Sequence, residues 1–388
     1  MDYDETKTAL SALDVAGLCQ KLGLVHQFVL DVAKDPSVYY EHFERPKKKG
    51  GVRKISASTG RLKRIQRQIL DGLLATVVMP PYVHGCVKGR SVATNAAVHV
   101  GHDVVINIDL KDFFGTVNSA RIQDIFQKYF GMEEASAVIF ANLCTYQNHL
   151  PQGAPTSPTL ANLAALELDE RILEMLKGVY NYTRYVDDIT ISGAKDLVSL
   201  LPQIYQAVEG CGFVCNLDKT RILRQSMRQS VTGIVVNKKL NPSKRFIRKV
   251  RQNLYYCIRF GLNEHCESLD IKPHNFIREM QGRIGYIRMT QENLADNFAN
   301  LLKDILPMSE ISDEEKNLLL LRTIIDNERM VAFMYEESHR QAAPTEIYVD
   351  ENDDTIFVKA FQFAPEPGWV EYRLAYMSEL TMQFNRLA

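Results

Sequence analysis

Three aspartates stand where their carboxylates could hold a divalent metal ion. Asp187 and Asp188 are adjacent within the β-rich stretch YNYTRYVDDITISG, and Asp109 lies at the end of the apolar stretch DVVINIDL. Adjacent carboxylates repel one another unless a cation neutralises them. If the two stretches form neighbouring strands, all three side chains come within reach of shared metal ions. A solvated turn is the alternative for an Asp-Asp pair taken by itself.

The ligand chemistry indicates which metal such a site would hold. Carboxylates suit Mg²⁺, which keeps several coordination positions for water and phosphate oxygens, and Mn²⁺ can substitute for it. Two ions about 4 Å apart can activate a sugar hydroxyl and stabilise a departing pyrophosphate. We therefore interpret Asp109, Asp187 and Asp188 as the catalytic, metal-binding residues of a nucleotidyl-transfer site with two Mg²⁺ ions as cofactors.

Residues near the aspartates could form a pocket for a deoxynucleoside triphosphate (dNTP). Phe113 and Phe114 follow the strand aspartate, and an aromatic ring there could lie under the sugar and exclude a 2′-hydroxyl. We expect Phe114 at the sugar and Phe113 in the core, although core packing is the alternative for both. Glycine in LPQGAPTSP lets the backbone approach a base pair closely. Cations for the triphosphate are available in FERPKKKGGVRKIS, namely Lys47, Lys48, Lys49 and Arg53.

Hydrophobic patterns predict the elements that position these residues. Helical spacing dominates residues 1–40 and, with many basic residues, 242–306. Beyond residue 312 an acidic helix leads into β-rich runs that predict a small antiparallel sheet or barrel. Between these regions the sequence predicts strands at 52–56 and 103–110, a basic amphipathic helix from residue 60 to Pro80-Pro81, a helix at 157–178, a hairpin at 180–193, a helix at 197–212 and strands near 213–223 and 230–237.

Charge divides the chain into a basic body and an acidic tail. The formal net charge is only −1, but residues 307–388 contain 16 acidic and 7 basic residues, a net charge of −9. The preceding residues therefore carry +8. This asymmetry indicates that the body meets polyanions while the tail faces something else. A solvated surface without a partner is the alternative.

Four motifs together resemble the palm motifs of reverse transcriptases. They occur in the family's order as NIDLKDFF, LPQGAPTSPTLAN, YVDD and NLDKT, preceded by the fingers-like segment PKKKGGVRKI, and they span residues 40–240. The resemblance implies an α+β right-hand polymerase fold with fingers, palm and helical thumb. It also implies that Arg53 and a neighbouring lysine touch the triphosphate, Gln152 lines the nucleotide pocket, Phe114 is the sugar gate and Lys219 is an acid that assists pyrophosphate departure.

Two further stretches resemble signatures of retron reverse transcriptases: Asn95-Ala96-x-x-His99 in SVATNAAVH, and Val231-Thr232-Gly233 in SVTGIVVN. The resemblance implies a structured non-coding RNA of the msr–msd type, priming from a 2′-hydroxyl within it, and an RNA-linked single-stranded DNA product (msDNA). It further implies antiphage defence with an effector protein. Both signatures would help to hold the RNA, which is read by shape, phosphates and 2′-hydroxyls. A buried histidine and a plain strand end are the alternatives.

The basic helical region fits a thumb that grips phosphates and stacks on bases. Its cations are Lys244, Arg245, Arg248, Lys249 and Arg251, interleaved with Tyr255 and Tyr256, and then Arg278, Arg283 and Arg288. We expect four parts: an N-terminal helical segment (1–40), fingers and palm (41–240), the thumb (241–312) and an acidic, mainly β C-terminal extension (313–388). We expect the extension to dock a partner protein such as the effector; inert capping of the thumb is the alternative.

The composition indicates where in the cell the protein resides, and two functions other than that of a retron enzyme remain as alternatives. No run of eighteen uncharged apolar residues occurs, the first ten residues lack signal-peptide features, and seven scattered cysteines favour reduced thiols. We therefore expect a cytoplasmic protein with no membrane partner. Two alternatives to a retron enzyme are another defence-associated reverse transcriptase, protein-primed or untemplated, and a non-catalytic RNA-binding scaffold.

Overall fold

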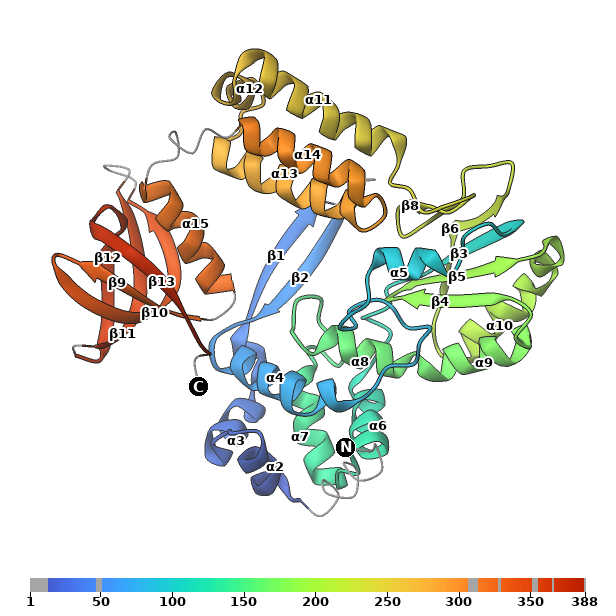
Figure 1. Cartoon of the computed structure of the whole chain (residues 1–388). Coiled ribbons are helices and arrows are strands. Elements are labelled where there is room, and N and C mark those ends of the chain that lie inside the picture. The colour runs from blue at the N-terminus through green and yellow to red at the C-terminus, as the bar shows by residue number, and fades with distance from the viewer. Residues whose placement is uncertain are drawn as a thin grey trace. The chain divides into compact units, whose positions relative to one another are not determined.

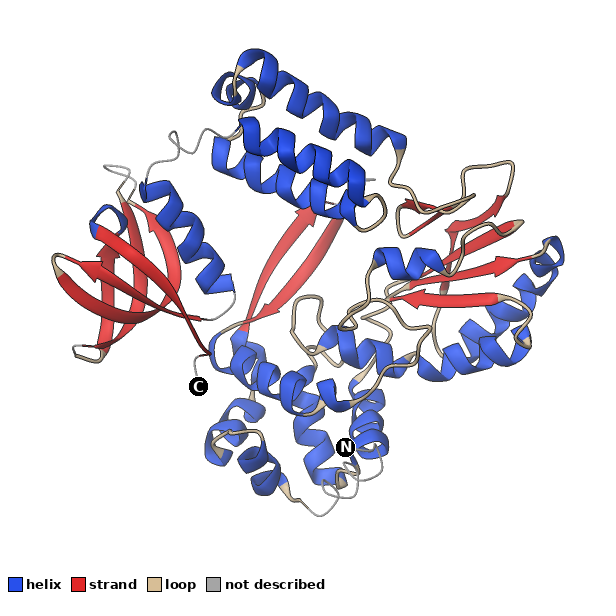
Figure 2. Cartoon of the chain, in the orientation of Figure 1, coloured by secondary structure: helices blue, strands red, loops and turns tan. Residues whose placement is uncertain are grey.

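The computed structural model describes residues 13–46, 51–305, 313–326, 329–350, 355–364 and 366–386 (Figure 1). The chain divides into two compact units. The first contains residues 1–246 and 289–291, and the second contains 247–288 and 292–388. Both units mix helices with antiparallel strands (Figure 2), so the predicted α+β class is confirmed. None of the helices in the described ranges is long and apolar enough to cross a membrane.

A four-stranded antiparallel sheet is the framework of the first unit. Its order is β4-β5-β3-β6, with bounds Asn181–Tyr185, Asp188–Gly193, Val104–Leu110 and Cys215–Arg224. The central strand β3 is apolar and β-branched, as suits a strand buried on both faces. One face packs on α9 (Leu166–Leu176) and α10 (Leu201–Gly210), which run below the sheet in Figure 1. Asp109 lies at the C-terminal end of β3.

Helices and one long hairpin complete the first unit. The hairpin pairs β1 (Tyr40–Pro46) with β2 (Val52–Ser58). The amphipathic helix α4 (Gly60–Gly72) buries Leu62, Ile65 and Ile69 in the core, as its spacing predicts. The remaining elements are α2 (Val15–Lys21), α3 (His26–Lys34), η1 (Pro36–Tyr39), η2 (Leu74–Thr76), α5 (Val92–Ala97), α6 (Ser119–Phe130), α7 (Glu134–Cys144), α8 (Ser157–Ala164), η3 (Lys195–Leu200), β7 (Ser230–Val231) and β8 (Ile234–Val235).

The second unit contains the basic helices and the acidic tail. The helices are α11 (Lys244–Phe260), which starts within the first unit, α12 (Leu262–Ser268), α13 (Pro273–Arg288) and α14 (Glu292–Ile305). The tail has α15 (Asp313–Asp326) packed on a five-stranded antiparallel sheet of order β12-β11-β10-β9-β13, with its own apolar core. Strand bounds are β9 Arg329–Tyr335, β10 Ser338–Val349, β11 Ile356–Ala364, β12 Gly368–Arg373 and β13 Met377–Arg386, with η4 at Leu374–Tyr376.

The structure departs from the predicted elements in one instructive place. The predicted helix at 157–178 is two helices, α8 and α9, separated at Ala165. The residue that precedes the first helix is Thr156, and neither its side chain nor that of Ser157 makes a capping hydrogen bond. Small residues on both sides of the break let α8 approach the rest of the core closely. The predicted boundaries between fingers, palm, thumb and extension stay predictions.

Candidate active site

The three predicted acids lie at one end of the palm-like sheet. Asp109 on β3 and Asp188 on β5 are directly opposite one another in the antiparallel register, a pairing that places Cα atoms about 4.5–5.5 Å apart. Asp187 lies in the turn between β4 and β5, and its carbonyl oxygen accepts a hydrogen bond from the Leu110 amide at 2.9 Å. Strands far apart in the sequence therefore bring these acids together, as the sequence predicts.

Negative charge accumulates where the acids meet. The pKa of Asp188 is raised to about 6, first because protein around the carboxylate displaces water and then because Asp187 and Asp109 are close. The pKa of Asp187 is also raised, chiefly by burial and further by Asp109, while Lys219 and Arg53 act in the opposite direction. These shifts are typical of carboxylates that lack sufficient positive charge nearby, so a divalent cation would favour their ionised forms.

Lys219 on β6 neutralises Asp109. Its Nζ lies 2.8 Å from both carboxylate oxygens, and Asn216 Nδ2 donates to Asp109 Oδ2 at 3.2 Å. Among the described residues no three His, Cys, Asp or Glu side chains converge closely enough, as they stand, to hold an ion. The donor set nevertheless fits Mg²⁺, because it consists of carboxylate oxygens alone. Full coordination would require Asp109 to exchange Lys219 for the metal.

A hollow of about 430 Å³ opens beside the acids. Asp109, Asp188 and Lys219 line it, together with Val92, Asn107, Tyr185, Thr190, Arg221, Ser230, Thr232 and Gly233. Thr232 and Gly233 both have left-handed backbone conformations, with φ of 47° and 88°, and Thr232 Oγ1 donates to the Val92 carbonyl at 3.1 Å. The Thr232-Gly233 turn thus borders the same hollow as the acids, although the neighbouring Val231 is fully buried.

The residues predicted to line the nucleotide pocket differ in how exposed they are. Phe113 is only 2% exposed and packs on Phe213 with ring centroids 5.5 Å apart, so it lies in the core, as expected, and not among the nucleotide contacts. Phe114 is half-buried beside it. Arg53 is exposed on β2, and Lys47 and Lys48, like Lys49, lie outside the described residues.

Gln152 belongs to a loop that docks on the fingers-like hairpin. Its carbonyl accepts a hydrogen bond from the Ser56 amide on β2 at 2.9 Å. The next residue, Gly153, has φ of 133°, and a Cβ there would lie 2.9 Å from the Ser56 carbonyl oxygen. Glycine is therefore required by the close approach of two backbones. The contact ties the LPQG loop to the strand that carries Arg53.

Burial contradicts direct RNA contact for part of the first retron-like signature. Asn95 and His99 are both 0% exposed. His99 is hydrogen-bonded through Nδ1 to Ser192 Oγ at 2.7 Å and through Nε2 to Thr183 Oγ1 at 2.8 Å. Burial lowers the pKa of His99 to about 3, so it stays neutral. The predicted contact of Asn95, His99 and Val231 with RNA is corrected accordingly: the histidine links the end of α5 to β4 and β5.

The predicted thumb cations mostly face solvent. Arg248, Lys249 and Arg251 are exposed on α11, and Lys244 and Arg245 are exposed at its start. Arg283 on α13 differs, because it is half-buried and forms an ion pair with Glu279 one turn earlier. Arg278 and Arg288 on the same helix are exposed, so seven of the eight predicted thumb cations are accessible from solvent.

Sequence reasoning missed a buried polar group behind the turn that carries Asp187. Asp169 on α9 and Arg184 on β4 form an ion pair in which both side chains are 0% exposed, and Asn162 on α8 is hydrogen-bonded to the arginine. One signal could have indicated it. Asp169 follows Ala165 and Leu168 on the apolar stripe of the helix, where an unpaired carboxylate would be destabilising.

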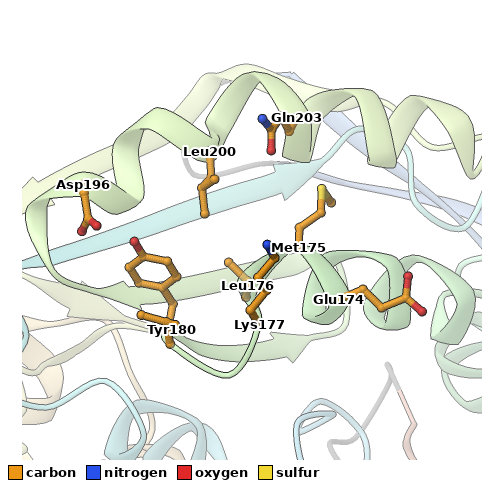
Figure 3. Close-up of a pocket in the computed structure, with 9 residues that line it drawn as sticks. Glu174, Met175, Leu176, Lys177, Tyr180, Asp196, Leu200 and Gln203 are labelled. Atoms are coloured by element: carbon orange, nitrogen blue, oxygen red, sulfur yellow. The ribbon is translucent and has the colours of Figure 1, made fainter.

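A second hollow lies away from the acids. Its volume is about 630 Å³, and it is formed by the end of α9 and the segment leading into α10 (Figure 3). Tyr180 and Asp196 face each other across it, and Leu200, Met175 and Gln203 complete the walls. No predicted site residue lines this hollow, so it is not part of the candidate active site.

Comparison with known proteins agrees with the geometry. The family model for reverse transcriptase (RNA-dependent DNA polymerase) matches residues 45–240. The chain is 34% identical over 311 residues to the Retron Mx65 reverse transcriptase of Myxococcus xanthus, covering 74% of this chain and 70% of that protein. It is 32% identical to the Retron Mx162 reverse transcriptase of the same organism, of which it covers 65%, and 29% identical to the Retron Ec86 reverse transcriptase of Escherichia coli, of which it covers 84%.

Solved structures give only distant likenesses. A telomerase from Candida albicans in complex with a fragment of telomeric RNA has 11% identity and a TM-score of 0.42, over 69% of this chain and 63% of that one. A foamy viral protease-reverse transcriptase in complex with double-stranded DNA has 14% identity and a TM-score of 0.40, over 86% and 51%. The sequence matches carry the assignment: the chain belongs to the retron reverse transcriptases and is an RNA-directed DNA polymerase.

Proposed function

We propose that this protein copies part of a structured non-coding RNA into RNA-linked single-stranded DNA, priming from a 2′-hydroxyl and joining nucleotides by two-metal catalysis. The observation that carries the proposal is the direct opposition of Asp109 and Asp188 across β3 and β5, with Asp187 in the adjoining turn. Membership of the reverse transcriptases implies a divalent metal in general; two Mg²⁺ ions are our specific proposal.

The three acids share one part in this chemistry, and Lys219 has another. Asp109, Asp187 and Asp188 would hold the ions, which when bound promote loss of the proton from the attacking hydroxyl and stabilise the departing pyrophosphate. Lys219 holds the Asp109 carboxylate in place through hydrogen bonds to both of its oxygens. With metal bound to Asp109, the Lys219 ammonium would be able to give a proton to the departing pyrophosphate. Its location on β6 beside the acids supports this role.

The nucleotide would occupy the space between the fingers-like hairpin and the acids. Arg53 acts on the pKa of Asp187, which supports a position close enough to the metal site to contact the triphosphate. The bond between the Gln152 carbonyl and the Ser56 amide holds the LPQG loop against the same hairpin. Phe114 is the candidate sugar gate because, unlike Phe113, it is not enclosed by the core.

RNA would be gripped by accessible groups. Thr232 and Gly233 line the same hollow as Asp109 and Asp188. The end of an RNA strand held by the Thr232-Gly233 turn would therefore lie close to these acids. The exposed cations of α11 offer sequence-independent phosphate contacts. His99 contributes indirectly, because its hydrogen bonds hold the end of the α5 segment against β4 and β5, and Val92 at the start of α5 accepts the Thr232 hydrogen bond. Asn95 is buried in the same helix.

The C-terminal sheet offers a docking surface for a partner protein, which we propose is a defence effector. Aromatic side chains gather on its outer face: Tyr348 stacks on Phe357 with centroids 5.5 Å apart, and Phe361 meets Trp369 at 5.6 Å. Trp369 is 62% exposed and lines an open hollow of about 820 Å³. Because residues 307–388 carry a net charge of −9, the fitting partner presents basic residues around an apolar anchor.

One experiment separates the proposal from its alternatives. The protein is purified from its native operon, and the bound nucleic acid is sequenced with and without ribonuclease and debranching treatment. We expect DNA whose linked RNA is removed by ribonuclease and which debranching releases. DNA that only protease releases would support a protein-primed enzyme. RNA without DNA would support a non-catalytic scaffold.

A further inference from the structure

A buried ion pair lies directly behind the catalytic turn. The Arg184 guanidinium grips the Asp169 carboxylate through two hydrogen bonds, Nε to Oδ1 and Nη2 to Oδ2, each 2.7 Å long. The Tyr182 hydroxyl donates to the same carboxylate at 2.6 Å. Burial disfavours the charge of Arg184, but Asp169 more than offsets this and raises the arginine's pKa. The arginine therefore keeps its charge although both side chains of the pair are fully buried.

The same guanidinium extends from the ion pair to the turn. Nη1 donates to Asn162 Oδ1 at 2.8 Å and to the Val186 carbonyl at 3.2 Å, and Nη2 donates to the Asn162 carbonyl at 3.1 Å. All five N–H groups of Arg184 thus have acceptors. Val186 has φ of 59°, a conformation that is strained for a β-branched residue. Arg184 holds the carbonyl of this strained residue, which immediately precedes Asp187.

Asn162 secures the opposite side of the turn. Its Nδ2 donates to the Gly85 carbonyl at 2.8 Å. Gly85 is packed so closely against the hairpin that a Cβ would lie 2.5 Å from the Val186 amide nitrogen. The neighbouring backbone adds two bonds at 2.8 Å, from the His84 amide to the Arg184 carbonyl and from the Arg184 amide to the Tyr82 carbonyl. The turn is therefore held from both sides by Asn162 and Arg184.

Stability alone does not account for this arrangement. A buried ion pair is often no more stabilising than well-packed apolar side chains of similar volume, and the site lies within an apolar core. The guanidinium offers something that apolar packing cannot, namely donors in a rigid planar fork that fix neighbouring groups in direction. Such fixing matters here because the register places Asp109 opposite Asp188 and the turn places Asp187 beside them, and carboxylates so close together repel one another.

We propose that Asn162, Arg184 and Asp169 are positioning residues that hold the Val186 turn against this repulsion and thereby set the affinity of the site for divalent metal. None of the three touches the reacting groups: Arg184 acts through Val186, Asn162 acts through Gly85, and Asp169 acts by holding Arg184. The inference rests on the proposed metal-binding role of the acids. Residues that orient metal ligands typically change metal affinity about 10–100-fold when they are mutated.

Asn162→Ala tests this inference while leaving the Arg184–Asp169 pair in place. Binding of Mn²⁺ to nucleic-acid-free protein is measured by electron paramagnetic resonance, and the Mg²⁺ concentration for half-maximal DNA synthesis is measured separately. We expect Mn²⁺ binding to weaken about tenfold, with a matching rise in the Mg²⁺ requirement. Hydrogen exchange of the Leu110 amide, which bonds the Asp187 carbonyl, should become faster.

Gln66→Ala is the matched control. Gln66 is a fully buried amide whose Nε2 donates to the Leu143 carbonyl at 2.8 Å, in a part of the first unit that does not contact the turn. Its replacement should lower the melting temperature about as much as Asn162→Ala but leave Mn²⁺ binding unchanged. Arg184→Lys is the second variant, because lysine keeps the charge beside Asp169 but cannot reach Asn162 and Val186 through a fork.

The outcomes are distinguishable. If wild-type protein binds no Mn²⁺, or binds it equally well after Asp187→Asn, the proposed metal site fails. If wild-type protein binds Mn²⁺ and both Asn162→Ala and Arg184→Lys bind it with unchanged affinity, the positioning role is overturned. Equal weakening by Gln66→Ala would also overturn it, since the effect would then be a general loss of stability.

Discussion

Asp109 and Asp188 occupy directly opposed positions on two antiparallel strands, β3 and β5. Because side chains alternate between the faces of a sheet, opposed residues share a face, and a slip of one residue would send the two carboxylates to opposite faces. The register of these strands is therefore what creates the site. The buried apolar side chains of both strands, Ile106, Ile108, Ile189 and Ile191, fix that register.

Asp109→Asn should abolish DNA synthesis without unfolding the protein. A metal ligand supplies several kcal/mol of transition-state stabilisation, so we expect the single-turnover rate of dNTP incorporation to fall about a thousandfold or more. Asp103→Asn is the matched control, because Asp103 is exposed beside the other end of the same strand. A comparable loss in both variants would contradict the assignment of Asp109.

The Mg²⁺ requirement should depend on pH through Asp188. Its pKa is raised to about 6, so protons compete with metal as the pH falls through that value, whereas above it the carboxylate is already ionised. We expect the Mg²⁺ concentration for half-maximal synthesis to be nearly constant from pH 7 to 8. Below pH 6 it should rise about tenfold per pH unit, as for a ligand that must lose one proton. A requirement that stays flat down to pH 5 would contradict this.

Phe114→Ala should relax the choice of sugar. If the ring excludes a 2′-hydroxyl, its removal leaves room for ribonucleotides, and we expect the ratio of kcat/KM for dNTP over rNTP to fall at least about tenfold. The effect should appear mainly in rNTP incorporation, with dNTP incorporation changed less. If the ratio is unchanged while the melting temperature falls, Phe114 packs the core as Phe113 does.

Trp369→Ala should separate partner binding from polymerisation. Trp369 is the most exposed aromatic residue of the outer face described for the C-terminal sheet, and its removal should leave dNTP incorporation unchanged. Binding of the purified protein encoded beside this gene, measured by calorimetry, should weaken at least about tenfold, as for an aromatic anchor. Tyr376→Ala, an exposed aromatic that does not line the hollow, is the control. Unchanged binding in Trp369→Ala would remove this face as the docking surface.

The sequence was most informative where local pattern determines structure. Apolar spacing predicted the buried face of α4, and β-branched runs predicted β3 and the β4–β5 hairpin, because these elements bury one stripe or both faces of a strand. The order of the motifs then predicted that Asp109 would meet Asp187 and Asp188. The positions of the other site residues depend on contacts between segments that are far apart in the sequence, and local pattern does not predict such contacts.

The sequence predicts the roles of buried polar residues least well. The sequence predicts RNA contacts for Asn95 and His99 and predicts no role for Asp169 and Arg184, yet all four are fully buried. A charged or polar residue is usually exposed unless it has a partner, and the partner cannot be identified from sequence when it lies on another element. Arg184 and Asp169, for example, are 15 residues apart on a strand and a helix.

Metal location tests the central claim most directly. Crystals of the protein soaked with Mn²⁺ and a dNTP would be measured at the manganese absorption edge. We predict anomalous peaks about 2.1 Å from carboxylate oxygens of Asp109 and of the Asp187–Asp188 pair, with Lys219 Nζ displaced from Asp109. The account would be contradicted if no manganese lay beside these three carboxylates and Lys219 were still hydrogen-bonded to Asp109.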